Sequence, residues 1–484
     1  MRRTAVSLVL AVALGLLALA PPLRAEGTNN QELKQKAIAT IDSQRSQLST
    51  LSDEIWAYAE TALTETRSAQ ALADHAEQQG FEVQRGVSGM PTAFVASFGK
   101  GSPVIGVLGE YDALPRLSQN ASPVRSPLSE GAPGHGCGHN LFGVGSLAAA
   151  TAIKQLIEAG ELKGTIRFFG TPAEEAIGGK IYMARDGLFD DLDMALSWHP
   201  SSETKINAEG SLAMVELNVA FRGEAAHAAY DPWNGRSALD GLELFTHALN
   251  LMREHVKPTV RIHYSIVDGG GAPNVVPESA KAALWIRDKE VVNVDALVER
   301  VKVIANGAAM AGNVDASVEL VSGTYNMLTN VEAAKVVQAN MEWLGAIEFD
   351  EYEQAFAREL QRNTGVPEKG LDGSVTPLVL DKKDGQQGST DVADVSWIVP
   401  TVDVEIATAP VDIPWHAWGV VAASGSPIGH RGMMYAAKVL STAMIDLYTS
   451  PEILRRAREE FEESTVGHAY ESYIPPGPPP VPGR

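Results

Sequence analysis

Apolar residues recur at two different spacings along the first part of the chain. Between residues 31 and 80, leucine, isoleucine and alanine side chains return every three or four positions with polar residues between them, which predicts helices that end at Gly80. Short apolar runs bounded by glycine and proline follow at 81–84, 92–98 and 104–109, and we expect each of them to be a strand. The last run is apolar throughout, which is typical of a strand buried on both faces of a sheet.

Helices and strands continue to alternate after this point. The segment 141–158 predicts a helix, 163–170 predicts a strand, and a short helix that ends at Asp186 precedes a further strand at 193–198. Strands that alternate with helices favour an α/β fold, in which a mixed, mainly parallel sheet is flanked by helices. Ligand sites of such sheets lie at the carboxyl ends of the strands.

The pattern changes near residue 211. A long alternating strand at 211–223 is followed by segments that predict a helix, two strands, a helix and a strand, in the order 237–255, 259–267, 280–287, 294–311 and 315–321. This order is that of a ferredoxin-like α+β unit. We therefore expect residues 211–323 to form an inserted domain.

The inserted unit divides the remainder of the chain. Residues 26–210 and 324–450 then form the two parts of one larger domain, which ends in a helix predicted at 432–448. Residues 451–484 are a tail. Its end, 474–484, consists mostly of proline and glycine, and this composition predicts disorder.

The first 25 residues have the pattern of a secretory signal peptide. Arg2 and Arg3 precede an apolar stretch at 6–20, which is too short for a lone membrane-spanning helix, and Ala25 offers a cleavage site before Glu26. An uncleaved membrane anchor is the alternative. With the signal removed, we expect a periplasmic or secreted protein without a membrane partner.

Composition narrows the choice of partners. The chain has 484 residues, 45% of them hydrophobic, and a formal net charge of −21. Its length permits two or more domains, each with its own core. The excess of negative charge argues against nucleic acid or an anionic membrane surface as a partner.

The segment 134–140, Gly-His-Gly-Cys-Gly-His-Asn, holds the only cysteine of the sequence, Cys137. Exported proteins commonly use cysteines in disulfide pairs, which a single cysteine cannot form within its chain. An inert buried thiol is one interpretation, but a loop of glycine and histidine is a poor place for it. A thiolate and the imidazole of His139, two residues apart, are instead typical metal ligands. His135 is either a third donor or a bystander.

Two carboxylates, Glu110 and Asp112, follow the strand at 104–109. The residues at strand ends that suit metal chemistry are Asp112, then Glu174 and Glu175, then His199. Neighbouring side chains of an extended segment point in opposite directions, so one glutamate of the pair 174–175 can bind metal while the other acts as a general base. A solvated acidic turn is the alternative for this pair. A satisfied core histidine is the alternative for His199.

These motifs, in this order and at these spacings, resemble the aminoacylase/carboxypeptidase family of dinuclear metallohydrolases. Within it they are similar to the amidohydrolase branch, which includes hippurate hydrolases, auxin-conjugate amidohydrolases and p-aminobenzoyl-glutamate hydrolases. The resemblance covers about residues 35–450 and implies a zinc-exopeptidase-like catalytic domain with an inserted lid or dimerisation domain. The matching segments lie at 136–140, 171–175, 198–200, 223–229, 232–240, 261–264, 273–277 and 388–392.

The resemblance implies two divalent metal ions, Zn or Mn. Cys137 would bridge them, with His139, Glu175 and His199 as further ligands. Glu174 would take a proton from water and return it to the leaving amine.

The resemblance also implies a last ligand from a histidine near the C-terminus. The candidates are His416, in Pro-Trp-His-Ala-Trp, and His430, in Ile-Gly-His-Arg-Gly. We favour His416, because His430 lies almost at the start of a predicted helix. Family members often have Gly-His-Ser-Trp at this point, so Trp415 and Ala417 are departures from the pattern.

The inserted domain would supply side chains that contact the substrate and the oxyanion, in addition to the metal ligands of the larger domain. The resemblance implies that His227 stabilises the oxyanion, often across the interface of a homodimer; a capping or core histidine is the alternative. Asn274 would bind the carbonyl or carboxylate of the substrate, and Arg287 is a carboxylate clamp or an exposed strand residue. Asp112 is expected to orient a ligand histidine, whereas Asp391 matches a family motif to which we assign no catalytic role.

The sequence therefore predicts a metal-dependent amidohydrolase. It would cleave the amide bond of N-acyl or aminobenzoyl amino acid conjugates such as p-aminobenzoyl-glutamate. A dipeptidase or carboxypeptidase of the same family is the enzymatic alternative. A metal- or peptide-binding protein with the same fold is the non-enzymatic alternative, although a binding protein needs no free base such as Glu174 beside the metal.

Overall fold

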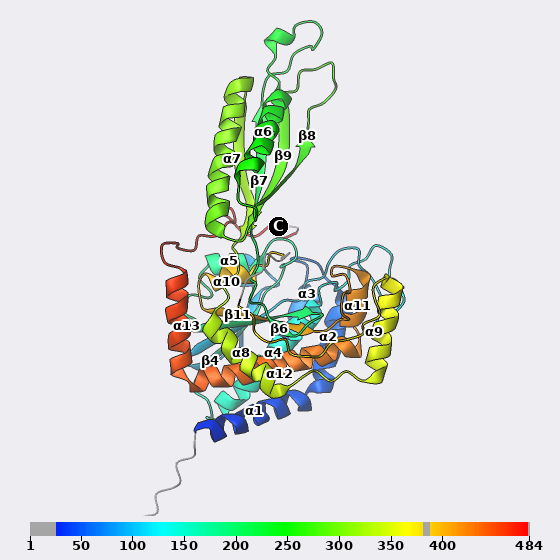
Figure 1. Ribbon diagram of the computed structural model, residues 1–484, viewed down its shortest axis with the longest axis vertical. Coiled ribbons are helices and arrows are strands. Elements are labelled where there is room, and N and C mark those ends of the chain that lie inside the picture. Colours follow the sequence, from blue (N-terminus) through cyan, green and yellow to red (C-terminus); the bar gives the residue numbers. More distant parts are fainter. Residues whose placement is uncertain (1–25, 381–387, 483–484) are drawn as a thin grey trace, which may run out of the picture.

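A seven-stranded sheet forms the centre of the larger part of the molecule, which we call the body (Figure 1). The structure is a computed structural model that describes residues 26–380 and 388–482. The strands of this sheet are β1 (Glu82–Arg85), β2 (Phe94–Lys100), β3 (Val104–Gly109), β4 (Gly164–Gly170), β5 (Met194–Ser201), β6 (Lys205–Ile206) and β11 (Thr401–Ala407). They lie in the order β1-β2-β4-β3-β5-β11-β6. Strands β4, β3, β5 and β11 run parallel, while β2 and β6 run antiparallel to their neighbours. The mainly parallel α/β sheet predicted from the sequence is confirmed.

Helices cover both faces of this sheet. One face carries α1 (Glu26–Ser43), α2 (Arg45–Tyr58), α3 (Thr66–Gln78), α4 (His139–Glu158), α8 (Val331–Leu344) and α12 (Pro427–Thr449). The other carries the short helices α5 (Gly179–Arg185) and α10 (Val392–Ser396). Alternate strand residues supply the two cores, since Phe168 of β4 packs on the first face and Phe169 on the second. Each such fully buried side chain stabilises the fold by about 1.5–3 kcal/mol.

Helix α1 lies on the side of the body away from the second sheet (Figure 1). Helix α1 packs there against α12. The predicted signal peptide, residues 1–25, lies outside the described residues. Within the described ranges, no helix combines the length and the apolar character that crossing a membrane requires.

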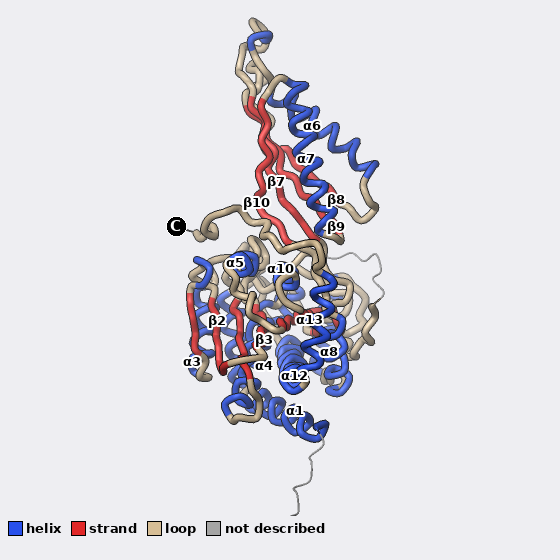
Figure 2. Tube along the Cα trace, turned by 90° about the vertical axis from the view of Figure 1, so that its left-hand side faces the viewer, coloured by secondary structure: helices blue, strands red, loops and turns tan. Residues whose placement is uncertain are grey.

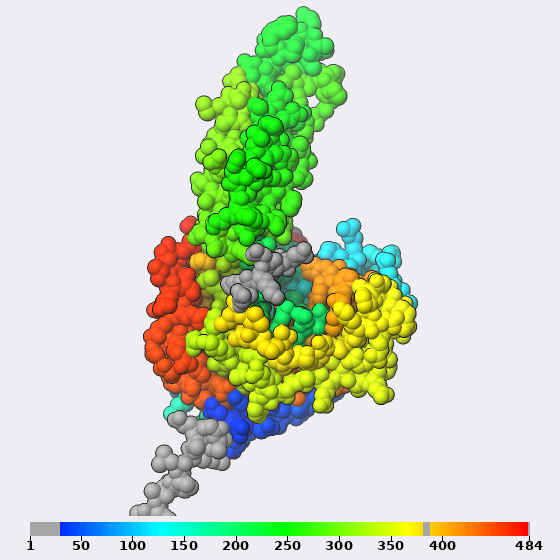
Figure 3. All heavy atoms as spheres, in the orientation of Figure 1, coloured from blue at the N-terminus to red at the C-terminus, as the bar shows by residue number. Residues whose placement is uncertain are grey.

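The second sheet belongs to a unit that projects from the body, as Figures 2 and 3 show. Its strands are antiparallel and lie in the order β10-β7-β9-β8. Alternate residues of β7, from Ala213 to Phe221, are buried against helices of the same unit. The chain order is strand-helix-strand-strand-helix-strand, so the predicted ferredoxin-like arrangement is confirmed. We call this unit, residues 213–324, the lid; its elements are β7 (Ala213–Arg222), α6 (Ala238–Met252), β8 (Arg261–Asp268), β9 (Ser279–Asp288), α7 (Val291–Gly312) and β10 (Asp315–Thr324).

The C-terminal segment makes contacts that its composition does not predict. The body also contains α9 (Glu351–Thr364), α11 (Trp418–Ser424) and α13 (Pro451–Ser464). After α13, the chain passes between the body and the lid (Figure 1). The hydroxyl of Tyr470 donates to Oδ1 of Asp394 at 2.9 Å, and the hydroxyl of Tyr473 donates to Asp295 of α7. We expected disorder from residue 474 onward, but the structure describes the chain up to residue 482 and buries Ile474. Ile474, before the prolines, and Val481, among them, supply this packing.

Candidate metal centre

The loop 134–140 is held close to the end of β5 by its glycines. Gly138 has a φ of 75°, and a Cβ atom at this position would lie 2.9 Å from Cβ of Pro200. Any other residue would therefore be strained and obstructed. Because α4 begins at the next residue, this close approach brings Cys137 and His139 beside His199.

Cys137, His139 and His199 form the first of two groups that share the cysteine. Their donor atoms lie within 4.8 Å of one another, and Sγ of Cys137 is 3.4 Å from Nε2 of His199. Nδ1 of His199 lies 2.7 Å from the carbonyl oxygen of Pro200, and Nδ1 of His139 lies 2.8 Å from Oδ1 of Asp112. These contacts orient both rings and leave Nε2 of each for a metal ion. Asp112 thus occupies the place expected of a residue that orients a ligand histidine.

Cys137, Glu175 and His416 form the second group, again with donor atoms within 4.8 Å of one another. Nε2 of His416 is 3.5 Å from Oε1 of Glu175, and the imidazole side chain is 55% exposed. The other C-terminal candidate, His430, lies on α12 and points Nε2 at Oδ1 of Asp53, 2.8 Å away. The structure therefore brings His416, and not His430, to the group.

Buried donor atoms in this site lack hydrogen-bond partners among the described residues. They include Nε2 of His139, Oε1 of Glu175 and Oε2 of Glu110. The atoms of His139 and Glu110 are 3.0 Å apart but are not aligned for a hydrogen bond. Buried polar atoms are normally satisfied, and thiolate, imidazole and carboxylate are the donors that zinc sites use. The residues therefore fit a pair of metal ions, each of which could take Cys137 as one of its ligands.

Glu110 is the site residue to which we assigned no role from its place in the sequence. Its carboxylate groups with His139 and the general-base candidate Glu174, with donor atoms within 4.8 Å of one another. Its position directly after β3, two residues before Asp112, was the available signal. Side chains two positions apart in an extended segment point to the same side, so the role expected of Asp112 was itself a signal for Glu110.

The carboxylates of the site are close enough to influence one another. Burial, followed by the charges of Glu110 and Asp391, raises the pKa of Glu174 well above its usual value. Burial also raises the pKa of Glu175 to about 7 and that of the Cys137 thiol above its ordinary range. A bound cation would offset these effects, because it stabilises the deprotonated ligands.

His135 stands apart from the candidate ligands. It is buried, and its Nε2 lies 3.1 Å from the carbonyl oxygen of Ile55 in α2. Burial lowers its pKa to about 4. It belongs to none of the donor groups found among the described residues, which agrees with its interpretation as a bystander.

The lid residues are not brought to the site within one chain. His227 and Asn274 lie in neighbouring loops at the end of the lid away from the body, where the N–H of Ala228 donates to the carbonyl oxygen of Asn274 at 3.0 Å. His227 is exposed, and its Nδ1 accepts from the N–H of Tyr230 at 3.1 Å. Arg287 lies at the opposite end of β9, where its guanidinium stacks on Trp285 at 5.1 Å.

A cavity of about 300 Å³ adjoins His199. Asp403 and Glu405 of β11 pair with Ser197 and His199 of β5, so these side chains share one face of the sheet. Burial raises the pKa of both acids. The remaining described residues of its wall include Phe142, Lys205, Asn207, Glu209, Ser211 and Thr390.

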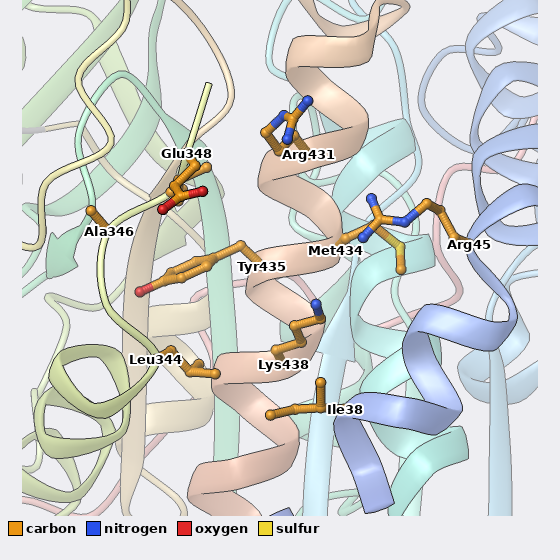
Figure 4. Close-up of a pocket in the computed structure, with 10 residues that line it drawn as sticks. Ile38, Arg45, Leu344, Ala346, Glu348, Arg431, Met434, Tyr435 and Lys438 are labelled. Carbon is orange, nitrogen blue, oxygen red and sulfur yellow. The ribbon is translucent and has the colours of Figure 1, made fainter. Parts of the chain in front are cut away.

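A second cavity, of about 240 Å³, lies elsewhere between α12 and the loop after α8 (Figure 4). Its cations already have partners: Arg431 contacts Glu353 at 2.7 Å, while Arg45 and Lys438 both contact Asp42 at 2.9 Å. None of its lining residues belongs to the candidate metal groups. This cavity is therefore separate from the chemistry of the site.

Comparison with known proteins places this fold and site in a family. The model of the peptidase family M20/M25/M40 matches residues 106–473. The chain belongs to this family, which confirms the resemblance carried by the motifs. It is a metal-dependent hydrolase of amide or peptide bonds.

The chain is similar over most of its length to enzymes of known name. It is 35% identical over 478 residues to one of the two subunits of the p-aminobenzoyl-glutamate hydrolase of Escherichia coli (strain K12), with 93% of this chain and 99% of the relative covered. It is 29% identical over 443 residues to the Xaa-Arg dipeptidase of Mus musculus, covering 89% of this chain and 92% of the relative.

Solved structures show the same fold at lower identity. A dinuclear metal-binding peptidase of the M20 family from Bacillus subtilis matches with a TM-score of 0.61 at 17% identity, covering 84% of this chain and 99% of that one. An aminobenzoyl-glutamate utilization protein from Klebsiella pneumoniae matches with a TM-score of 0.56, also at 17% identity, covering 83% and 96%. These matches concern the fold alone.

Proposed function

We propose that the chain is a dinuclear amidohydrolase that cleaves N-acyl or aminobenzoyl amino acid conjugates, such as p-aminobenzoyl-glutamate. The observation that carries this proposal is the membership of Cys137 in two donor groups. One ion would be held by Cys137, His139 and His199, and the other by Cys137, Glu175 and His416. The name of the E. coli relative supports the substrate class.

The protein's own residues would supply the proton transfers. Two divalent ions, Zn or Mn, would polarise the scissile carbonyl and make a water molecule more acidic. Glu174 would accept a proton from the attacking water and deliver it to the nitrogen of the leaving amine. Burial acts on the pKa of Glu174 in the direction that makes its carboxylate a better base.

A homodimer would complete the site. His227 and Asn274 project on a lid that holds them away from the metal groups of their own chain. A second copy could present the same two residues to this site, where His227 would stabilise the oxyanion and Asn274 would bind the substrate. Arg287, at the base of the lid, would pair with a substrate carboxylate.

A dipeptidase is the second candidate, and the cavity beside His199 favours it. Among the described charged residues of its wall, Asp403, Glu405 and Glu209 are acidic, whereas Lys205 is basic. Such a wall suits a cationic side chain, and a relative at 29% identity is an Xaa-Arg dipeptidase. If this candidate is correct, an arginine conjugate is a better substrate than its glutamate counterpart, and Glu405→Gln reverses that preference.

The experiment that tests the proposal uses protein stripped with EDTA and reloaded with Zn or Mn. p-Aminobenzoyl-glutamate, other N-acyl amino acids and dipeptides are then assayed for amide cleavage. We expect no cleavage by the stripped protein and recovery on reloading. Activity that survives thorough chelation would contradict the mechanism.

The signal-like segment 1–25 supports a proposed periplasmic or secreted location. Expression of the full chain with a C-terminal tag, followed by fractionation and N-terminal sequencing, tests this. A mature protein that begins near residue 26 in the exported fraction is expected. Retention of residues 1–25 in a membrane fraction would favour the uncleaved anchor instead.

A further inference from the structure

A lysine is completely buried beside the candidate metal centre. Lys180 of α5 has no exposed surface, and its ammonium nitrogen lies 2.5 Å from Oε1 of Glu110 and 2.7 Å from Oδ1 of Asp391. Both carboxylates are buried as well. Lysine is rarely buried without a partner, because removing a charge from water is costly. Here one ammonium serves two carboxylates that are 70 and 211 positions away in the sequence.

The same lysine fixes the end of the loop that carries the glutamate pair. The backbone N–H of Lys180 donates to Oδ2 of Asp391 at 2.9 Å, while the side chain of Lys180 bonds the other oxygen. Asp391 therefore holds both the main chain and the side chain of one residue. This gives Asp391, for which the sequence suggested no catalytic role, a defined structural task.

Two further carboxylates hold the same loop, residues 171–180, at earlier positions. The N–H of Ala173 donates to Oε1 of Glu65, and the N–H of Glu175 donates to Oδ2 of Asp112, each at 2.9 Å. Burial opposes ionisation of Asp112, but His139 lowers the pKa of Asp112, so the bond to Asp112 is charge-assisted and therefore about twice as strong as a neutral one. The backbone on either side of Glu174 is thus fixed by buried acids from distant segments.

The conformation of this loop needs such support. Ala173 has a φ of 63°, in the left-handed region that residues other than glycine avoid. Gly179 packs so closely that a Cβ atom there would lie 2.0 Å from the carbonyl oxygen of Pro172. Such a strained backbone conformation persists only where contacts with the surrounding structure hold it in place.

Glu110 connects this support to the general-base candidate. One of its oxygens accepts from Lys180, and its carboxylate groups with Glu174 and His139 within 4.8 Å. We propose that Lys180, together with Glu110 and Asp391, is a positioning unit that holds the loop 171–180 so that the carboxylate of Glu174 faces the metal groups. The role of Glu174 rests on the proposed function, whereas the fixation of the loop can be measured without any substrate.

Hydrogen exchange of the intact protein tests the fixation. Lys180→Met removes the ammonium, and exchange of the peptide spanning 171–180 should become at least about ten-fold faster. Lys154→Met is the matched control: its side chain is 6% exposed and pairs with Glu158 of the same helix at 2.7 Å, away from this loop. Exchange of the loop should stay at the wild-type rate in this control. An unchanged rate in Lys180→Met would overturn the proposal.

Asp391→Asn provides a second variant should Lys180→Met fail to fold. It keeps the shape of the side chain and one acceptor oxygen but removes the charge that Lys180 faces. A smaller acceleration of exchange, confined to the same peptide, is expected. A wild-type rate in a folded Asp391→Asn protein would overturn the proposal.

Kinetics separate positioning from a general structural role. Lys180→Met should lower kcat by at least about ten-fold, with KM and metal content unchanged, and should add little to Glu174→Gln, because the group that it positions is already removed. A loss that adds fully to that of Glu174→Gln, or a loss of bound metal, would overturn the proposal. Wild-type protein that cleaves no amide would contradict the proposed function alone, because the exchange rates are measured independently of turnover.

Discussion

The Sγ atom of Cys137 lies 3.4 Å from Nε2 of His199, although 62 positions separate the two residues. The same sulfur also groups with Glu175 and His416. A thiolate in this position could donate to two ions at once, and metal ligation would make it less nucleophilic toward oxidants. This relationship explains how a chain with a secretion-like first segment can keep a single unpaired cysteine.

Removal of Cys137, which belongs to both donor groups, should therefore release more metal than removal of a ligand that belongs to one group. Cys137→Ala removes a donor from both groups and should abolish binding of both ions, while His416→Ala should leave one ion bound. Metal analysis of dialysed protein measures the stoichiometry. Equal metal content in Cys137→Ala and wild-type protein would return the thiol to an inert structural role. His430→Ala is the matched control and should retain both ions, because His430 faces Asp53.

Removal of the base should affect turnover and leave the metal in place. Glu174→Gln keeps the size of the side chain but cannot accept a proton, so kcat should fall by about 10²–10⁴-fold. Metal content should match that of the wild type, since Glu174 belongs to neither group that shares Cys137. The measurement pairs steady-state kinetics with metal analysis. A variant that retains most of its kcat would assign the proton transfer to another residue.

The separation of His227 from the metal groups leads to a test with mixed dimers. His227→Ala and Glu174→Gln are each expected to be inactive, but exchange of protomers creates one site with both groups intact. About a quarter of the wild-type activity should return, since half of the dimers are mixed and each mixed dimer has one complete site. Activity of the mixture is measured after mild dissociation and reassembly. No recovery despite proven exchange would place the action of His227 within its own chain or remove it from catalysis.

The parts of the site that follow strand ends were predictable. Hydrophobic runs locate the strands, parallel strands gather their carboxyl ends, and this is sufficient to associate Asp112, Glu175 and His199. The loop of Cys137 was predictable from its chemistry, because glycines and histidines around one cysteine suit no core. The sequence favoured His416 over His430 only because His430 lies near the start of a predicted helix, and the structure supplied the contact with Glu175 that motif and spacing could not predict.

The buried support of the site was not predictable from one sequence. Lys180 and Asp391 are 211 positions apart. Lysine and aspartate are usually exposed, and only the fold shows that these two are buried together. Hydrophobic periodicity gives no information on such pairs, because they interrupt the pattern. The contacts of the C-terminal segment were missed for a related reason. Its prolines suggest disorder, and the few apolar side chains that fix it have no periodic spacing.

Asp394, at the junction of the body and the C-terminal segment, should make stability depend on pH. Burial raises its pKa from 3.8 to about 7, although it accepts hydrogen bonds from the hydroxyls of Thr324 and Tyr470. Between about pH 4 and 7 the folded protein keeps a proton here that the unfolded chain has lost. The free energy of unfolding therefore falls as pH rises through this window, by at most about 4 kcal/mol.

Asp394→Asn imitates the protonated acid and isolates this effect. The free energy of unfolding of the wild type, minus that of Asp394→Asn, should decrease from pH 5 to pH 8. Denaturant unfolding of metal-loaded protein at each pH measures both values. Asp186→Asn, at an exposed position on the end of α5, should follow the wild-type curve throughout. A difference between wild type and Asp394→Asn that is flat, or that grows with pH, would mean that the carboxylate is already ionised in the folded protein and that its hydroxyl partners outweigh the cost of its burial.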